Sequence, residues 1–164
     1  MIPPTTALNR YAANRNKHAL YLNETRDELH YGFRIGDLNF LLKPKEKIEV
    51  IEAAPACPIP NTPGWFSGMV NLRGDLLPVF DINFLITKNP VKAKWIMIFR
   101  HNGRSAGIYI DTLPSGITLE ICAESEINLP DILQGCTENI YMQDNNTWIE
   151  TDFEKLFQKL RARF

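Results

Sequence analysis

The stretch NTPGWFSGMVNLRGDLLPVFD, residues 61–81, decides how this chain folds. It holds two short apolar runs that meet at Arg73-Gly74-Asp75, and the second run continues through INFL at 82–85. Glycine readily takes a backbone conformation that other residues avoid, so Gly74 marks a tight turn. The segment therefore predicts two β-strands joined by a short turn that displays Arg73.

The residues before this stretch predict a second hairpin and one further strand. YGFRI (31–35) and LNFLLK (38–43) flank a glycine turn at Gly36-Asp37, and KIEVIE (47–52) follows. Because side chains alternate along a strand, Ile48 and Val50 share one face of the third strand. The proline-rich segment 55–63 is predicted to be a loop, since proline has no N–H group to donate to a sheet.

The residues after it continue the pattern of short strands and end in a helix. WIMIF (95–99) and AGIYI (106–110) flank Asn102-Gly103, a typical two-residue hairpin turn, and further candidate strands are GITLEI (116–121), ENIYM (138–142) and NTWIE (146–150). Strands of this length and spacing are typical of small β-barrels or a sandwich. An apolar stripe at helical spacing predicts a closing amphipathic helix that Thr151 or Asp152 could cap; its members are Phe153, Leu156, Phe157 and Leu160.

Composition narrows the class of protein. The chain has 164 residues, of which 45% are hydrophobic, and a formal net charge of −1. These values indicate one globular domain, or two small subdomains that share a core, and disfavour a general nucleic-acid binder, which would carry a basic excess. No apolar run approaches the roughly 20 residues of a membrane-spanning helix, and the N-terminus does not resemble a signal peptide, so we expect a cytoplasmic protein. We expect residues 1–28 to be an extension, partly helical or flexible, with one short helix around 8–11, and residues 29–164 to be the folded domain.

Charge is segregated along the chain. Residues 84–110 hold five basic and no acidic residues, 105–154 hold ten acidic and no Lys or Arg, and 155–164 hold four basic residues. Such asymmetry can steer a charged partner. The alternative is that the basic C-terminal residues fold back over the acidic segment.

Catalytic and metal-binding patterns are weak. Gly103-Arg104-Ser105-Ala106-Gly107 matches the nucleophile motif of α/β-hydrolases, but no histidine follows His101 and the motif lies in a predicted hairpin. Asp81 and Asp111 each end an apolar run and could form an acid–base pair, although an Asp in that place more often caps a turn. The three cysteines, Cys57, Cys122 and Cys136, form no metal-binding pair, and no phosphate-binding glycine loop is present, so we expect neither a metal nor a cofactor.

Residues 61–81 resemble the signature of the CheW-like domain family: Pro63, then Gly68, apolar residues, Asn71-Leu72-Arg73-Gly74, an apolar pair, Pro78 and Asp81. The resemblance extends from about residue 30 to about residue 159, with Gly107 to Asp111 similar to a later family stretch. Within the family, the opening residues 32–36, the position of Trp65 and the N-terminal extension look most like the PilI-type adaptors of type IV pilus chemosensory systems.

The resemblance implies an all-β fold of two five-stranded SH3-like β-barrels packed together, with a C-terminal helix. It also implies a non-enzymatic adaptor that couples a methyl-accepting chemoreceptor to the regulatory domain of a CheA-like histidine kinase, with twitching motility as the output and no direct insertion into the membrane. The alternatives are a flagellar chemotaxis coupling protein, a coupling protein for another effector, and a small β-barrel hydrolase that uses Ser105 or the Asp81/Asp111 pair.

Two partner surfaces follow from these patterns. Leu42, Ile48, Val50 and Ile51 are expected to offer apolar side chains beside an open strand edge to the kinase. Arg73 is expected at the mouth of a receptor-binding groove with Met69, Val70 and Leu72 nearby, or else in an ion pair with Asp75 or Asp81. Trp65, which lies in a loop between glycines, is expected to be exposed on a binding face.

Overall fold

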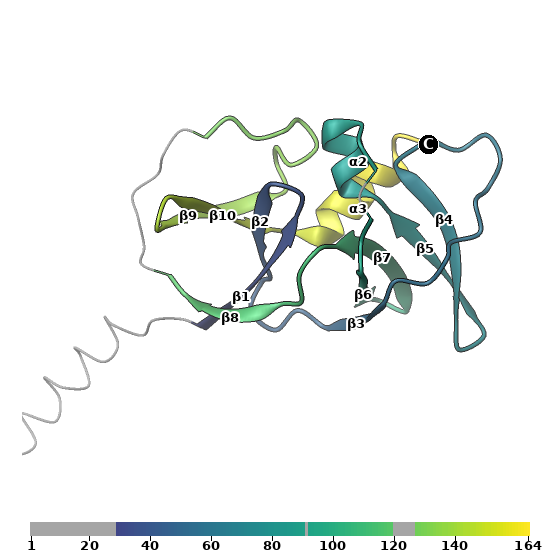
Figure 1. Cartoon of the computed structure of the whole chain (residues 1–164), viewed down its shortest axis with the longest axis horizontal. Coiled ribbons are helices and arrows are strands. Elements are labelled where there is room, and N and C mark those ends of the chain that lie inside the picture. Colours follow the sequence, from purple (N-terminus) through teal and green to yellow (C-terminus); the bar gives the residue numbers. More distant parts are fainter. Residues whose placement is uncertain (1–28, 91, 120–126) are drawn as a thin grey trace, which may run out of the picture.

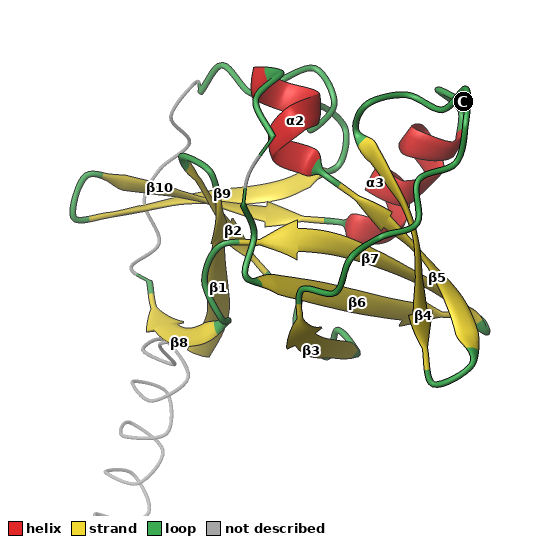
Figure 2. Cartoon of the chain, turned by 45° about the vertical axis from the view of Figure 1, so that its right-hand side comes forward, coloured by secondary structure: helices red, strands yellow, loops and turns green. Residues whose placement is uncertain are grey.

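The computed structural model describes residues 29–90, 92–119 and 127–164, which build two β-sheets and two helices. Figures 1 and 2 show the sheets side by side, with the helices α2 and α3 on the side that carries the chain's C-terminus. The predicted pair of five-stranded β units and the C-terminal helix are confirmed. The predicted N-terminal extension and its short helix lie outside the described residues.

The first sheet has the order β8-β1-β2-β10-β9. It consists of β1 (Leu29–Ile35), β2 (Leu38–Leu41), β8 (Ser115–Thr118), β9 (Thr137–Gln143) and β10 (Asn146–Thr151). The hairpin predicted around Gly36 is present as β1 and β2, and the two segments predicted after residue 137 are present as β9 and β10. All neighbours are antiparallel except β2 and β10, so strands from both ends of the domain meet at the centre of this sheet.

The second sheet has the order β3-β6-β7-β5-β4. It consists of β3 (Ile48–Glu52), β4 (Phe66–Leu72), β5 (Asp75–Phe80), β6 (Trp95–His101) and β7 (Arg104–Ile110). The turn residues Arg73 and Gly74 both have positive φ, 55° and 93°, as do Asn102 and Gly103, with 48° and 73°. Two consecutive positive φ values match the right-handed twist of a hairpin, which explains why both predicted turns form.

The second sheet curls around a core of its own. Its buried members are Val70, Leu77, Val79, Ile96 and Ile98, and Ile51 and Tyr109 pack against them. All five strands contribute to this cluster, although β3 and β4 are at opposite edges of the sheet. Only a strongly curved sheet can bring both edges to one interior, as the predicted barrel requires.

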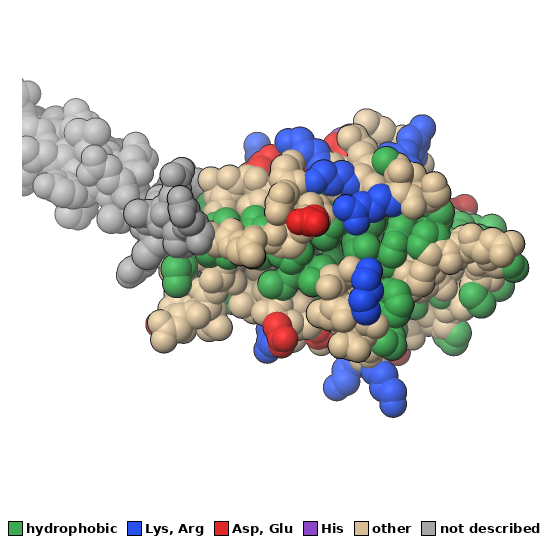
Figure 3. Space-filling view, turned by 90° about the horizontal axis from the view of Figure 1, so that it is seen from above, with side chains coloured by type: hydrophobic (Ala, Val, Ile, Leu, Met, Phe, Trp, Pro, Cys, Tyr) green, Lys and Arg blue, Asp and Glu red, His purple; other side chains and the backbone are tan. Residues whose placement is uncertain are grey.

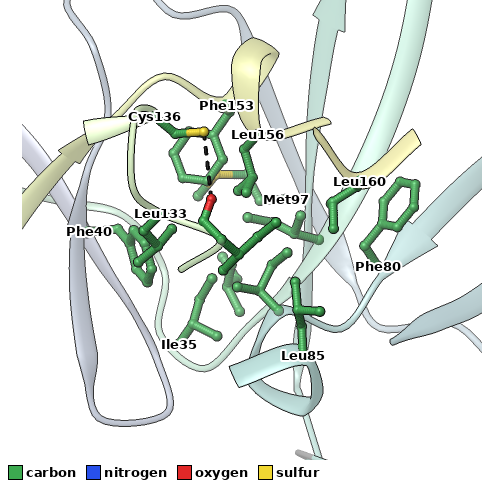
Figure 4. Close-up of a cluster of buried hydrophobic side chains, with 14 of the residues drawn as sticks. Ile35, Phe40, Phe80, Leu85, Met97, Leu133, Cys136, Phe153, Leu156 and Leu160 are labelled. Carbon is green, nitrogen blue, oxygen red and sulfur yellow. Dashed lines mark hydrogen bonds between the residues drawn. The ribbon is translucent and has the colours of Figure 1, made fainter. Parts of the chain in front are cut away.

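A larger core lies between the two sheets (Figure 4). Ile35 and Phe40 enter it from the first sheet, Phe80 and Met97 from the second, and Leu133 from the segment before β9. The helix α3 (Phe153–Arg161) fills the centre, with Phe153, Leu156 and Leu160 fully buried, as the apolar stripe predicted. The two sheets therefore share one core with α3.

Both helices begin at an aspartate. Asp152 accepts a hydrogen bond from the Lys155 N–H at 3.0 Å and is the N-cap of α3, one of the two predicted caps. Asp81 accepts from the Phe84 N–H at 2.8 Å and is the N-cap of α2 (Ile82–Thr87). The sequence reading of 82–85 as a continuation of the apolar strand was wrong, because this cap ends the strand and starts a helix.

Candidate partner-binding surfaces

Strand β3 is the exposed edge predicted for the kinase-facing surface. It is the last strand of the second sheet and, among the described strands, pairs only with β6. Ile48 and Val50 are half-buried against the core between the sheets, on one face as predicted, and Ile51 is half-buried against the core of the second sheet. The free edge of β3 thus carries partly accessible apolar side chains, a combination that favours pairing with another strand.

Leu42, from the same predicted set, is mostly buried. Its side chain is 6% exposed and belongs to the core between the sheets. The Leu42 N–H donates to the Tyr31 carbonyl at 2.9 Å, so the chain continues the β1–β2 pairing for one residue. Leu42 also lines a surface pocket with Lys43 and Ile48, and its contact with a partner stays a prediction.

Arg73 stands at the tip of the β4–β5 hairpin with its side chain 74% exposed. Its guanidinium donates to Glu49 Oε1 at 2.8 Å, across from the hairpin on β3. The predicted partners Asp75 and Asp81 were wrong, and Asp81 caps α2 instead. The reason is the curl of the sheet, which brings the β4–β5 turn to the opposite edge strand.

Glu49 joins two arginines. Arg100, on β6, donates to Glu49 Oε2 at 2.8 Å while Arg73 holds Oε1. The hydrogen bond from Arg100, together with the charge of both guanidinium groups, holds the pKa of Glu49 below its ordinary value. These three side chains, called the Glu49 cluster below, carry two positive charges and one negative charge on an accessible surface.

The apolar residues around Arg73 divide between surface and core. Leu72 and Met69 are half-buried, whereas Val70 is 2% exposed inside the second sheet, so its predicted place in a groove was wrong. Leu76, which the sequence analysis did not single out, is 67% exposed on β5. Alternation along the strand turns Leu77 inward and Leu76 outward, and this is the signal that could have identified it.

Trp65 is buried, not exposed as predicted, with 8% of its surface accessible. Its ring stacks on Phe80 at 6.1 Å between centroids and meets Phe164 edge-on at 5.1 Å. The Trp65 carbonyl also accepts a hydrogen bond from the Asp81 N–H at 2.8 Å. The loop before β4 folds back onto β5 and the chain end, which removes Trp65 from solvent.

The residues of the catalytic alternatives have other contacts in the structure. Ser105 pairs with Arg100 across the β6–β7 hairpin and lines one cleft together with His101 and Glu154. His101 Nε2 lies 3.1 Å from Glu154 Oε1. Asp111 accepts a hydrogen bond from the Gly36 N–H at 2.6 Å, and so, like Asp81, it holds a backbone group in place.

Neither a metal-binding cluster nor a membrane-spanning helix is present in the residues that the structure describes. Within 29–90, 92–119 and 127–164, no group of three or more His, Cys, Asp or Glu side chains is placed to hold a metal ion. Cys57 is exposed and Cys136 is buried, and burial raises the pKa of the Cys136 thiol. In the same part of the chain, no helix has the length and apolarity needed to cross a bilayer.

Among the residues that the structure describes, the C-terminal basic residues make one close contact with the acidic segment. Lys155 lies 3.7 Å from Asp152, and Lys159 donates to the Gln134 carbonyl rather than to an acid. Asp152 and Glu138 instead hold Lys43, which precedes β3, at 2.8 and 2.7 Å. The expected folding of the basic end over the acidic segment is therefore limited, in the described residues, to one contact within α3.

Comparison with known proteins points to one family. The family model described as "CheW-like domain" matches residues 30–161. The chain is 28% identical over 92 residues to "Chemotaxis protein CheW" of Helicobacter pylori, covering 54% of this chain and 56% of that protein. It is 32% identical over 83 residues to "Protein PilI" of Pseudomonas aeruginosa, covering 49% of this chain and 47% of that protein.

A solved structure has the same fold. The crystal structure of scaffolding protein TtCheW from Thermoanaerobacter tengcongensis aligns with a TM-score of 0.65 at 23% identity, over 79% of this chain and 86% of that chain. The matched part spans about half the length of the curated relatives. Both sheets and α3 lie within the residues that the family model matches.

Proposed function

The chain belongs to the CheW-like domain family, and on that basis we propose that it is a non-enzymatic scaffold of chemosensory signalling. It couples a methyl-accepting chemoreceptor to a CheA-like histidine kinase, in the cytoplasm beside membrane receptor arrays. The observation that carries the proposal is the family match over 30–161, which takes in both sheets and the helix between them. The fold shared with a protein described as a scaffolding protein supports it.

The receptor surface of this proposal is centred on the Glu49 cluster. Arg73 is exposed and bonded to a carboxylate that also holds Arg100, so its guanidinium is held in one place rather than free in solvent. Leu72 is half-buried at the same hairpin end, and Leu76 is exposed there on the opposite face of β5. A hairpin tip that carries a charged group and apolar side chains suits the helical tip of a receptor, which presents both kinds of side chain.

The kinase surface is the free edge of β3. Ile48, Val50 and Ile51 supply partly accessible apolar side chains, and the exposed Lys45 and Lys47 keep this edge soluble when it is unpaired. Leu42, Trp65 and Val70 act beneath the two surfaces as packing residues. A regulatory domain with a free strand of its own can bind here by strand pairing.

We assign the output to type IV pilus twitching motility. The similarity to PilI, at 32% identity, favours this output, while the matches to chemotaxis CheW proteins at 28% identity favour flagellar chemotaxis as the second candidate. Deletion of the gene should shrink the twitching zone on agar and leave swimming unchanged. Loss of swimming with normal twitching would select the second candidate.

Pulldowns with purified receptor tip and purified kinase regulatory domain test the coupling. Arg73→Glu should lose the receptor and keep the kinase, and Ile48→Glu should do the reverse. Arg163→Glu reverses a charge at an exposed residue outside both surfaces and should keep both partners. Binding of both partners by all variants would refute the proposed surfaces. Ester or peptide hydrolysis that is lost on Ser105→Ala would refute the non-enzymatic role.

A further inference from the structure

A cleft of about 810 Å³ lies between α3 and the β4–β5 and β6–β7 hairpins. Its volume is in the usual range for binding pockets, and its lining is mostly apolar. It is open to solvent along the helix and not enclosed, so an occupant can extend beyond it.

Phenylalanine side chains form a rigid floor. The rings of Phe66 and Phe80 lie 5.4 Å apart, those of Phe80 and Phe157 5.7 Å, and those of Phe157 and Phe99 5.6 Å. Phe66, Phe80 and Phe99 are each less than 9% exposed and so are held by the core on their other side. Such a floor can receive apolar side chains without repacking, which lowers the entropic cost of binding.

The rim of the cleft carries two arginine side chains without a partner among the described residues. Arg104 and Arg161 both line the cleft, both are exposed, and neither has an ion pair or side-chain hydrogen bond within the described part of the chain. Glu154 is the one acidic residue among the lining side chains, and it is engaged by His101 at 3.1 Å. An occupant with a carboxylate would therefore meet two free guanidinium groups.

The face that carries α2 and the chain's C-terminus also combines apolar and basic side chains. Figure 3 views the molecule from above, on the side that carries α2 and the chain's C-terminus, and shows a continuous band of hydrophobic side chains with Lys and Arg on both sides. Acidic side chains are sparse on this face. Apolar surface bordered by basic groups is typical of sites that take acidic, apolar segments.

The cleft is separate from the surfaces assigned above. Arg100 turns toward Glu49 on one face of β6, whereas its neighbours Phe99 and His101 line the cleft on the other face. The cleft lining thus includes none of the three side chains of the Glu49 cluster.

We propose that this cleft binds a short acidic and apolar peptide segment of a further partner protein. Its Leu or Phe side chains rest on the phenylalanine floor, and a flanking Asp or Glu pairs with Arg104 and Arg161. The site lies outside the receptor and kinase surfaces, so the inference goes beyond the proposed function. A peptide rather than a small amphiphile is favoured because the cleft is open and its two arginines lie on different elements, the β7 strand and α3.

Selection of a random peptide display library on the full chain tests this site. Enriched peptides should carry Asp or Glu next to Leu or Phe, and fluorescence anisotropy on the best one should give a dissociation constant that rises at least about tenfold in Arg104→Glu and in Arg161→Glu. Arg163→Glu makes the same charge change two residues from Arg161 but outside the lining, and should change affinity less than about twofold. Circular dichroism melts establish that each variant is folded.

Three results would overturn the proposal. One is the absence of any enriched peptide family. Another is enrichment of basic peptides, and a third is equal loss of affinity in Arg163→Glu and Arg161→Glu, which would indicate only general charge attraction. Dodecanoate serves as a probe for the small-molecule alternative: saturable binding of dodecanoate with no peptide enrichment would show a lipid-like ligand instead.

Discussion

Asp152 takes part in two stabilising interactions, and two substitutions of this residue can measure their energies separately. It caps α3 through the Lys155 N–H at 3.0 Å, and its other oxygen accepts from Lys43 at 2.8 Å. Lys43 lies in the segment that leads from the first sheet into β3, so this pair ties the proposed kinase edge to the central helix. Asp152→Asn keeps a good N-cap and removes the charge, whereas Asp152→Ala removes both interactions.

The structure sets the size of each effect. The Asp152 and Lys43 side chains are 13% and 27% exposed, so the ion pair is partly shielded from water. Lys43 keeps Glu138 at 2.7 Å in either variant, which limits the loss. We therefore expect Asp152→Asn to lower the free energy of unfolding by about 1–2 kcal/mol. Asp152→Ala should lower it by about 2–3 kcal/mol, because the lost cap adds about 1 kcal/mol.

The pH dependence has a definite sign. Burial alone would raise the pKa of Asp152, but the hydrogen bonds from Lys43 and the Lys155 N–H outweigh it and leave this pKa below its ordinary 3.8. A carboxyl group with a lowered folded pKa stabilises the protein above its unfolded pKa and loses that contribution as pH falls through the folded pKa. The same hydrogen bond raises the pKa of Lys43, so the contribution persists on the alkaline side. The gap between wild type and Asp152→Asn should be constant from about pH 5 to 9 and shrink below about pH 4.

Urea unfolding followed by tryptophan fluorescence and circular dichroism measures these differences. Equal destabilisation by the Asn and Ala variants would show that the cap contributes nothing. Destabilisation below about 0.5 kcal/mol in both variants, or a wild-type gap that does not change toward pH 3, would refute the role of the Lys43 pair. The slope of the free energy against urea concentration should be unchanged, since neither variant alters the area exposed on unfolding.

Four further substitutions have defined outcomes. Arg73→Ala should leave the melting temperature unchanged and weaken receptor binding in pulldowns, because Arg73 is 74% exposed and Glu49 keeps Arg100; a clearly lower melting temperature would assign Arg73 to stability instead. Gly68→Ala should destabilise the protein more than Gly103→Ala in thermal melts. Both glycines have positive φ, 120° and 73°, so both substitutions strain the backbone. At Gly68 the new Cβ would also collide with the backbone of Cys57, whereas at Gly103 it would meet open space. Leu76→Ser should leave stability within about 0.5 kcal/mol, because Leu76 is 67% exposed, and should weaken receptor binding; loss of stability in urea unfolding would contradict its placement.

Local sequence was sufficient to predict those features whose stabilising interactions all lie within one short segment. The turns at Arg73-Gly74 and Asn102-Gly103 form as predicted because their backbone conformation depends on residues within the turn. The stripe from Phe153 to Leu160 predicted α3 because helical periodicity is a property of neighbouring residues, and Asp152 stands where a cap is needed. The family motif at 61–81 then identified the arrangement of two sheets, which the strand pattern alone left between barrels and a sandwich.

Other features depended on residues far apart in the chain. KIEVIE (47–52) was predicted to be a strand. Only the structure shows that this strand leaves the sheet of the preceding hairpin and pairs with β6. The sequence of a single strand does not specify which other strand it pairs with. The same holds for Arg73, whose partner Glu49 is 24 residues away, and for Trp65, which is buried by Phe80 and by Phe164 at the other end of the domain. Sequence determined most of the strands, the hairpin turns and the helix α3, because those preferences are local, but it misread the start of α2 as strand. Which side chains reach solvent was decided by the curl of the second sheet and the packing of the chain end, because burial is set by contacts between distant segments.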